Sequence, residues 1–338
     1  MSVLHDTARE LVAPAKGILA ADESTGTIKK RFDSIGVEST EEQRRRYRQL
    51  LFTTPEVGDH ISGVILFDET IRQTADDGRT FVDVLRASRV VPGIKVDTGA
   101  KPLAGFPNET VTEGLDGLRE RLAEYAHLGA RFAKWRSTII IGDVTPTDFA
   151  ILANAHGMAR YAALCQEAGI VPIVEPEILM DGDHDLAACG SATDRTLDAL
   201  YEQLAAHRVD LPGSLLKVNM VVPGKGNAVQ DDDVAIAKAT IETLAAHVPA
   251  AVSGVVFLSG GMTDEQATNR LNEMNKIGGF PWELSFSYGR ALQAPSLTAW
   301  KGEEANVEAA QAAFAHRAKM NGLARSGDYA PEMESSAA

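Results

Sequence analysis

Residues 170–179 read IVPIVEPEIL, an apolar run that ends in two glutamates, Glu175 and Glu177. A short run of this kind, rich in Ile and Val and bounded by polar residues, is typical of a buried strand. The two-residue offset places Glu175 and Glu177 on the same face of that strand. This stretch therefore predicts a strand that carries two carboxyl groups at its C-terminal end.

Similar apolar runs occur on both sides of this stretch, and each is followed by a longer amphipathic or charged segment. Successive runs are roughly 30 to 45 residues apart, the length of a strand plus a crossover helix, and such crossovers yield parallel strands. The eight runs are Gly17–Ala21, Gly63–Phe67, Val91–Val96, Ala130–Trp135, Ile170–Val174, Ser214–Met220, Gly254–Leu258 and Glu283–Phe286. They predict an α/β fold, a single closed (β/α)8 barrel of the TIM type.

The segments between the runs support a barrel surrounded by helices. In residues 115–128, LDGLRERLAEYAHL, Leu and Ala recur at helical spacing and the opposite face is charged. Residues 145–148, TPTD, are expected to open another helix, with a cap followed by Pro in the first turn. Because no Ser/Gly/Pro-rich linker divides the chain, we predict one domain over residues 1–325 and a short mobile tail over residues 326–338.

The composition limits the class of partner. The 338 residues are 44% hydrophobic and carry a formal charge of -14, so the chain lacks the basic field that nucleic acid or an anionic membrane surface would require. An anionic small molecule would need a local cluster of Lys and Arg in a cleft. Only Cys165 and Cys189 occur, and no segment resembles a signal peptide or a membrane span, which predicts a cytoplasmic protein.

The predicted strand ends are unusually polar. In a barrel of this type, catalytic groups stand at the C-terminal ends of the strands, so side chains there are expected to converge on one cavity. In chain order these ends carry Asp22, Glu23 and Ser24, Asp68 and Glu69, Lys95 and Asp97, Lys134 and Arg136, Glu175 and Glu177, Lys217 and Asn219, Ser259 and Gly260, and Ser287 and Arg290.

Lys217 is the candidate nucleophile among the strand lysines. It lies between the apolar segments SLL and VNM, where a charged ammonium is costly, and a neighbouring cation such as Lys134 would further favour the neutral amine. Glu175 and Glu177 would supply the proton transfers that imine formation needs. A single strand lysine is more often structural or paired with a carboxylate. Taken one at a time, Lys95 and Lys134 are as good candidates for the nucleophile as Lys217.

Two stretches could bind phosphate. Residues 259–261 (SGG) and 287–290 (SYGR) follow the last two predicted strands, where barrels often build a phosphate site from backbone amides, although the glycines could equally serve tight turns. Ser24, Thr27 and Arg31 could form a second anion site. Alternatively, residues 29–31 (KKR) are a solvated helix face.

Two further motifs are weak. Residues 224–227, GKGN, lack the GxxxxGK[ST] spacing of a phosphate-binding loop, and no GxGxxG follows a predicted strand, so nucleotide binding is unsupported. Residues 181–185, DGDHD, resemble a metal loop, but His184 has no second histidine at ligand spacing. A polar turn without metal is the better interpretation.

Across most of the chain these motifs resemble class I fructose-bisphosphate aldolase. The resemblance runs from about Leu11 to about Ala324 and rests on GILAADESTG, GVILF, GIKVD, FAKWR, IVPIVEPEIL, LLKVNM, FLSGG and FSYGRALQ. It implies a (β/α)8 barrel that needs no metal or cofactor. It also implies reversible cleavage of fructose 1,6-bisphosphate to dihydroxyacetone phosphate and glyceraldehyde 3-phosphate in glycolysis and gluconeogenesis, in a homo-oligomer, often a tetramer.

The resemblance also implies a role for each matching residue. Lys217 would form the imine, Glu175 would be the acid/base, Glu177 would assist near Lys217, and Asp22 would position the amine and the C4 hydroxyl. Lys134 and Arg136 would line the cavity, Lys95, Ser24 and Thr27 would lie near one phosphate, Ser259, Gly260, Gly289 and Arg290 near the other, and Arg31 would be a further anion contact.

The chain departs from the family pattern at three positions. Thr27 stands where the family usually has Ser, Val218 replaces the usual Pro after the nucleophile, and the chain ends in Ala338 where many relatives have Tyr.

Two alternative functions remain open. Sedoheptulose bisphosphate and fructose 1-phosphate are alternative substrates, because they share the imine chemistry with fructose 1,6-bisphosphate. A non-catalytic barrel would leave the joint presence of Lys217, Lys134, Glu175 and Asp22 without a reason.

Overall fold

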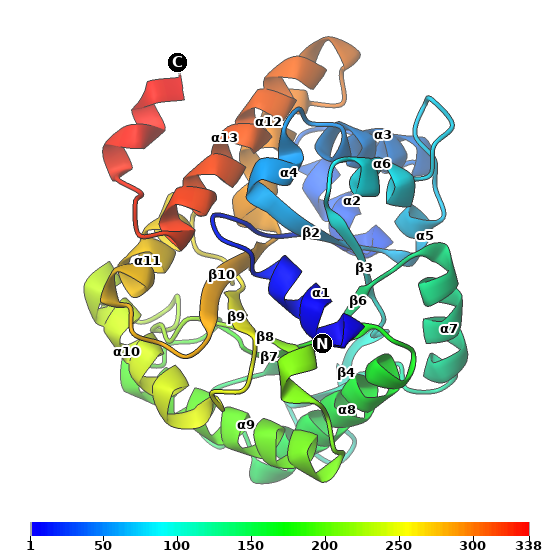
Figure 1. The fold of residues 1–338 in the computed structure, drawn as a ribbon. Helices are drawn as coiled ribbons and strands as arrows, with labels where there is room; N and C mark the ends of the chain where they lie inside the picture. Colours follow the sequence, from blue (N-terminus) through cyan, green and yellow to red (C-terminus); the bar gives the residue numbers. More distant parts are fainter. Residues whose placement is uncertain (1, 338) are drawn as a thin grey trace.

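Eight parallel strands close into a barrel in the computed structural model, which describes residues 2–337 (Figure 1). Their order around the barrel is β1-β10-β9-β8-β7-β6-β3-β2. The strands are β1 (Gly17–Ala21), β2 (Ile61–Leu66), β3 (Val91–Lys95), β6 (Phe132–Ile139), β7 (Val171–Ile178), β8 (Leu215–Val218), β9 (Gly254–Phe257) and β10 (Glu283–Tyr288). Each of them overlaps one predicted run, so the predicted fold class is confirmed.

Strands β6 and β7 extend further than their apolar runs predict. The runs end at Trp135 and Val174, whereas the strands continue side by side to Ile139 and Ile178. Over this extension Arg136 lies opposite Glu175, and Thr138 lies opposite Glu177. Cross-strand pairs of opposite charge or of polar groups stabilise a ladder, so the polar residues do not end these strands.

Helices surround the barrel (Figure 1). They are α1 (Val3–Leu11), α2 (Thr25–Asp33), α3 (Glu41–Phe52), α4 (Val57–His60), α5 (Asp68–Ile71), α6 (Phe81–Ala87), α7 (Leu118–Leu128), α8 (Asp148–Glu167), α9 (Leu186–Ala206), α10 (Asp233–His247), α11 (Asp264–Ile277), α12 (Arg290–Trp300) and α13 (Val307–Arg325). Three short 3-10 segments are η1 (Leu211–Gly213), η2 (Glu304–Asn306) and η3 (Pro331–Ala337). The predicted helix over residues 115–128 is α7. No helix among the described residues is both long and apolar enough to span a membrane.

The start of α8 corrects one expectation. Thr147 is the N-cap and its hydroxyl accepts a hydrogen bond from the Ala150 N–H at 3.2 Å. Pro146 therefore precedes the cap and does not lie in the first turn. The buried carboxylate of Glu109 fixes this arrangement, because it accepts hydrogen bonds from both the backbone N–H and the hydroxyl of Thr147 at 2.7 and 2.6 Å.

A two-stranded hairpin of β4 (Gly99–Pro102) and β5 (Thr110–Glu113) was not predicted. It follows β3 and packs beside β6, where the Thr112 hydroxyl donates to the Arg136 carbonyl at 2.8 Å. Most of its side chains are at least partly exposed, so it has no apolar run to mark it. The hairpin adds one wall to the mouth of the barrel.

Apolar side chains fill the N-terminal half of the barrel interior. They come from alternate strand positions and pack against α1, which lies across this end in Figure 1. The buried cluster is Ala8, Leu11, Val12, Ile18, Ala20, Ile65, Val91, Phe132, Val171, Ile173, Leu215 and Val256. A Cβ at Gly93 would lie 2.3 Å from the Phe132 ring, so the ring occupies space that only a glycine leaves. This end of the barrel is therefore closed.

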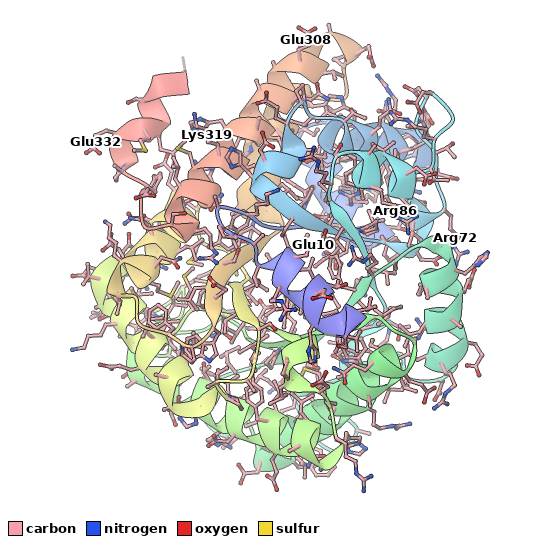
Figure 2. All side chains as sticks on the ribbon, viewed as in Figure 1. Glu10, Arg72, Arg86, Glu308, Lys319 and Glu332 are labelled. Carbon is pink, nitrogen blue, oxygen red and sulfur yellow. The ribbon has the colours of Figure 1, made fainter. Side chains whose placement is uncertain are left out.

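The C-terminal segment contacts α13. Glu334 in η3 pairs with Arg317 at 2.5 Å and with His316 at 2.9 Å, and Tyr329 is buried with its hydroxyl donating to Glu334 at 3.0 Å. Figure 2 shows this segment, with Glu332 labelled, next to α13 with Lys319. Ala338 lies outside the described residues. The division into a barrel over residues 1–325 and a mobile tail stays a prediction.

The packing of Phe132 against Gly93 gives a test of the barrel interior. Gly93→Ala should lower the free energy of unfolding by about 2 kcal/mol, because the added methyl group overlaps a buried ring. Urea denaturation measures the change. Gly157→Ala is the matched control, since α8 leaves open space around that position, and it should be neutral or stabilise by up to about 1 kcal/mol. Equal stability of the two variants would contradict this packing.

Candidate active site

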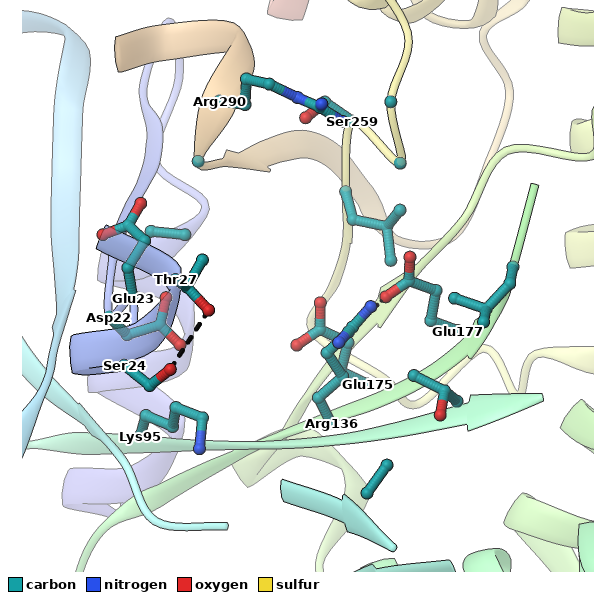
Figure 3. Close-up of a pocket in the computed structure, with 18 of the residues that line it drawn as sticks. Asp22, Glu23, Ser24, Thr27, Lys95, Arg136, Glu175, Glu177, Ser259 and Arg290 are labelled. Carbon is teal, nitrogen blue, oxygen red and sulfur yellow. Dashed lines mark hydrogen bonds and ion pairs between the residues drawn. The ribbon is translucent and has the colours of Figure 1, made fainter. Parts of the chain in front are cut away.

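The C-terminal ends of the strands open into a cavity of about 780 Å³ (Figure 3). Within the described chain its lining runs from Ala20 to Arg290. The lining includes every site residue that the sequence predicts, namely Asp22, Ser24, Thr27, Arg31, Lys95, Lys134, Arg136, Glu175, Glu177, Lys217, Ser259, Gly260, Gly289 and Arg290. The expected convergence of the strand ends on one cavity is therefore observed.

Three of the polar residues expected at the strand ends do not line this cavity. Asp68 begins α5 outside the barrel, where it pairs with Arg72 at 2.8 Å, and Glu69 pairs with Arg44 at 2.5 Å. Asn219 is buried and its side-chain oxygen accepts a hydrogen bond from the Ile178 N–H at 2.9 Å. These residues hold neighbouring elements together, because the chain turns away from the barrel axis before it reaches them.

Lys217 reaches the cavity from β8 through simple alternation. Leu216 and Val218 face the helices and belong to the outer core, while Leu215 lies inside the barrel in the apolar layer. Lys217 shares the inner face with Leu215 and is 4% exposed. Val218, the departure from the family pattern, is a regular strand residue whose carbonyl accepts a hydrogen bond from the Leu258 N–H at 3.0 Å.

Glu175 connects the two buried lysines. One carboxylate oxygen lies 3.1 Å from Lys217 Nζ, and the other lies 3.3 Å from Lys134 Nζ. All three side chains are buried. Glu175 is therefore placed to accept a proton from Lys217 or return one, while Lys134 remains as its second counter-charge.

Asp22 forms the other side of this network. Its carboxylate lies 2.9 Å from Lys134 Nζ, and Asp97 lies 4.0 Å from the same atom. Burial acts to raise the pKa of Asp22, but Lys134, Lys217 and Lys95 outweigh it and hold the pKa well below its ordinary value. Burial acts to lower the pKa of Lys134, and the carboxylates of Asp22, Glu175 and Asp97 raise it further than burial lowers it. Lys134 is therefore a permanent cation and Asp22 a permanent anion at neutral pH.

Glu177 differs from its expected neighbourhood. Its carboxylate pairs with Arg136 Nε, whereas the contact of Lys217 is with Glu175. The reason is the register, because Arg136 lies opposite Glu175 on the adjacent strand and its long side chain reaches the next inward position, that of Glu177. Glu177 is thus positioned through Arg136 and not through Lys217.

One candidate anion-binding surface lies at the start of α2. Ser24 is the N-cap residue, yet its hydroxyl lies 3.1 Å from the Thr27 hydroxyl and does not cap the helix. Lys95 extends towards the same side of the cavity in Figure 3 and is held by Asp97 at 2.7 Å. An uncapped helix N-terminus with two hydroxyls and an ammonium suits a phosphate. Thr27 retains the hydroxyl that the family usually takes from Ser.

A second candidate anion-binding surface lies at the ends of β9 and β10, where Figure 3 shows Ser259 and Arg290 together. Gly260 and Gly261 have φ values of 53° and 108°, so the interpretation as turn glycines is correct. Gly289 is the N-cap of α12 and has no side chain to cap it, and Arg290 follows as the first helical residue. The turns therefore leave backbone amides and a guanidinium available to an anion.

Arg31 lies beside this second surface. One of its guanidinium nitrogens is 3.6 Å from the position that a Cβ of residue 289 would take. Arg31 also pairs with Glu23, a buried residue that in turn pairs with Arg48 at 2.5 Å. The alternative of a solvated helix face holds for Lys29, which is exposed and pairs with Asp33 at 2.7 Å. The KKR segment is therefore divided between the cavity and solvent.

Three residues contribute to the site beyond those with a predicted role, although Asp97 and Glu23 stand among the predicted polar strand ends. Asp97 binds Lys95 and accepts a hydrogen bond from the Arg136 N–H at 3.3 Å, and its position two residues after Lys95 was the available signal. Glu23 lines the cavity and pairs with Arg31. Lys225 lines the cavity although it lies in the GKGN segment, which was compared only with a phosphate-binding loop.

The DGDHD segment forms part of a loop pair. Backbone N–H groups of Gly224 and Gly226 donate to the carbonyls of His184 and Gly182, each at 2.8 Å. Among residues 2–337, no group of three or more His, Cys, Asp or Glu side chains is arranged to hold a metal ion.

Comparison with known proteins gives consistent matches over nearly the whole chain. The family model described as fructose-bisphosphate aldolase class-I matches residues 3–338. The chain is 55% identical over 327 residues to the "Probable fructose-bisphosphate aldolase class 1" of Xanthomonas campestris, covering 96% of this chain and 98% of the relative. It is also 55% identical over 317 residues to the cytosolic fructose-bisphosphate aldolase 4 of Arabidopsis thaliana, covering 94% and 81%.

A solved structure agrees with these matches. The fructose-bisphosphate aldolase of Plasmodium falciparum, crystallised with TRAP and a small-molecule inhibitor, superposes with a TM-score of 0.96 at 47% sequence identity. The superposition covers 97% of this chain and 95% of that chain.

The charge network predicts a pH-dependent contribution of Asp22 to stability. Because the folded-state pKa lies below the ordinary value of 3.8, the carboxylate stabilises the fold above that pH, and the contribution is lost as the pH falls towards the folded-state pKa. Asp22→Asn should lower the free energy of unfolding by about 2 kcal/mol at pH 7. Urea denaturation from about pH 7 to about pH 2.5 should show this difference decreasing below about pH 4. Asp33→Asn is the exposed control and should change stability by less than about 0.5 kcal/mol. A pH-independent difference for Asp22→Asn would refute the assignment.

Proposed function

The chain belongs to the class I fructose-bisphosphate aldolase family, and on that premise we propose that Lys217 is the lysine that forms the imine with the substrate. The enzyme is a metal-independent lyase that cleaves fructose 1,6-bisphosphate reversibly to dihydroxyacetone phosphate and glyceraldehyde 3-phosphate. The observation that carries the assignment is the buried contact between Lys217 and Glu175, with Lys134 on the other oxygen of the same carboxylate.

Imine formation uses this contact directly. The neutral amine of Lys217 attacks the C2 carbonyl of the ketose, and loss of water leaves a protonated imine. Both stages need protons to move, and Glu175 lies within 3.1 Å of the nitrogen where they are exchanged. Lys134 remains charged throughout, so it stabilises Glu175 as an anion without competing as a nucleophile.

Cleavage then proceeds through the imine. A carboxylate accepts the proton of the C4 hydroxyl, the C3–C4 bond breaks, and its electron pair moves into a C2–C3 double bond as the imine nitrogen becomes neutral. We assign the proton acceptance to Glu175 and the positioning of the C4 hydroxyl to Asp22. Protonation of C3 and hydrolysis of the imine release dihydroxyacetone phosphate and restore the amine.

The two anion-binding surfaces fit the two phosphates of the substrate. We assign Ser24, Thr27 and Lys95 to one, and Ser259, Gly260, Gly289 and Arg290 to the other. Arg31 belongs with the second set, since it lies beside Gly289. Fructose 1,6-bisphosphate is the substrate we favour over sedoheptulose bisphosphate, while fructose 1-phosphate would leave one surface empty.

Other parts of the proposal concern the whole molecule. We place the enzyme in the cytoplasm and expect a homotetramer, which is the common assembly in this family. Its Arabidopsis relative carries "cytosolic" in its name. We also propose that residues 1–325 form the catalytic barrel and that residues 326–338 are an appendage, because the cavity lining described above ends at Arg290.

The imine assignment is tested by trapping. Borohydride reduction with dihydroxyacetone phosphate should attach the substrate to Lys217, found by peptide mapping, and Lys217→Ala should reduce cleavage by at least about a thousandfold. Lys95→Met is the matched control, because that lysine lines the cavity but is held by Asp97, and it should still be labelled at Lys217. Label on Lys134 or Lys95 in the unmodified protein would overturn the assignment.

The phosphate assignment is tested at Arg290. Arg290→Ala should weaken binding of dihydroxyacetone phosphate by about ten- to a hundredfold, because a guanidinium contact with phosphate is charge-assisted and often bidentate. Lys at the same position should restore only part of the affinity. Calorimetric titration measures both, and Arg119→Ala, an exposed arginine on α7, should behave as the unmodified protein. Unchanged affinity in Arg290→Ala would show that this surface has been misassigned.

A further inference from the structure

Lys225 stands on a turn whose position is fixed by the neighbouring loop. Its backbone N–H donates to the Met180 carbonyl at 2.8 Å, and the N–H groups of Gly224 and Gly226 donate to His184 and Gly182 at the same distance. The GKGN and DGDHD segments, which carry no function as separate motifs, thus form one hydrogen-bonded unit. This unit places Lys225 at the wall of the cavity.

The glycines on either side of Lys225 allow the close approach of the two loops. A Cβ at residue 224 would lie 2.4 Å from the Gly182 carbonyl oxygen, and one at residue 226 would lie 3.0 Å from the same atom. Side chains at these positions would push the turn outwards. The backbone that carries Lys225 is therefore held against the loop by packing as well as by hydrogen bonds.

The ammonium of Lys225 lies close to the guanidinium of Arg290. Lys225 Nζ is 2.6 Å, and an Arg290 nitrogen 3.2 Å, from the position that a Cβ of Gly261 would occupy. Two cations that approach one point repel each other unless an anion lies between or beside them. The ion-pair partner of Lys225 is Asp181, at 3.5 Å and with 75% of its side chain exposed, and such exposed pairs are weak.

We propose that Lys225 is a further phosphate-binding residue of this enzyme, which acts with Arg290 and exchanges Asp181 for the phosphate when substrate binds. The proposal rests on the assignment of the surface at β9 and β10 to a phosphate. A phosphate dianion would neutralise both cations and accept hydrogen bonds from the amides near Gly260 and Gly261. Asp181 holds Lys225 at the cavity wall when the cavity is empty. The Asp181 carboxylate should therefore slightly oppose binding of the phosphate.

The test compares a phosphorylated ligand with its uncharged counterpart. The rate of inactivation by borohydride, measured against ligand concentration, gives the half-saturating concentration of dihydroxyacetone phosphate and of dihydroxyacetone. Lys225→Met should raise the value for dihydroxyacetone phosphate about tenfold and leave that for dihydroxyacetone within about twofold. Lys225→Arg should remain within about threefold for both ligands, because it keeps the charge.

Two companion variants sharpen the result. Asp181→Asn removes the competing carboxylate and should lower the half-saturating concentration of dihydroxyacetone phosphate by about twofold, the opposite direction to Lys225→Met. Lys238→Met removes an exposed lysine from α10 and should change neither ligand. Added salt should weaken binding of dihydroxyacetone phosphate less in Lys225→Met than in the unmodified protein.

The outcomes separate this inference from the function beneath it. If the unmodified protein forms no trapped imine, the assignment of Lys217 fails. If it does, and Lys225→Met binds dihydroxyacetone phosphate as tightly as the unmodified protein, only the role of Lys225 is refuted. Equal weakening for dihydroxyacetone phosphate and dihydroxyacetone would also refute it, because the change would then reflect a disturbed loop and not a lost phosphate contact.

Discussion

The carboxylate of Glu175, held between Lys217 and Lys134, is the contact on which the rest of the site depends. Charges buried at this depth are tolerated only when they are paired, and removing one partner leaves the others uncompensated. Lys134 therefore needs Asp22 and Asp97 as well as Glu175, and Asp97 in turn holds Lys95. The network joins groups on or directly after β1, β3, β6, β7 and β8, so each of these strands positions a group that another of them requires.

The barrel supplies the rigidity that this network needs. Inward positions change from apolar at one end of the strands to charged at the other, as from Leu215 to Lys217 and from Ile173 to Glu175. Outward positions remain apolar and pack against the helices. A charged residue on such a strand has few alternative conformations, because its neighbours along the chain are fixed in the outer core. The geometry of the proposed imine site is thus set by packing around it, before any substrate enters.

Much of this arrangement could be predicted from local sequence, and the exceptions have physical causes. The eight strands were visible because buried strands need apolar runs, and Glu175 and Lys217 were visible because charge at the end of such a run is unusual. The β4–β5 hairpin gave no signal, since its side chains are largely exposed. The partner of Glu177 depends on the register between β6 and β7, which no single strand encodes.

Contacts between residues that are far apart in the sequence explain the remaining differences between the predicted and the observed site. Arg31 faces the cavity while Lys29 faces solvent, and only the buried carboxylate of Glu23, itself held by Arg48 from α3, distinguishes the two. Lys225 lines the cavity because its loop is hydrogen-bonded to residues 180–184, which lie much earlier in the chain. The local sequence of the GKGN segment does not indicate this position, because it depends on contacts with a distant loop.

The closure of the barrel by α1 has a consequence for the release of products from the enzyme. The apolar layer beneath Lys217 packs against α1, and the cavity lies at the opposite end of the barrel, where the strands end. In the proposed mechanism, cleavage leaves one fragment covalently bound to Lys217 at the base of the cavity and the other free. The free aldehyde can leave at once, whereas the ketone is released only after water has reached the imine beside the apolar layer. The covalent bond thus sets the order of product departure, and no moving gate is required.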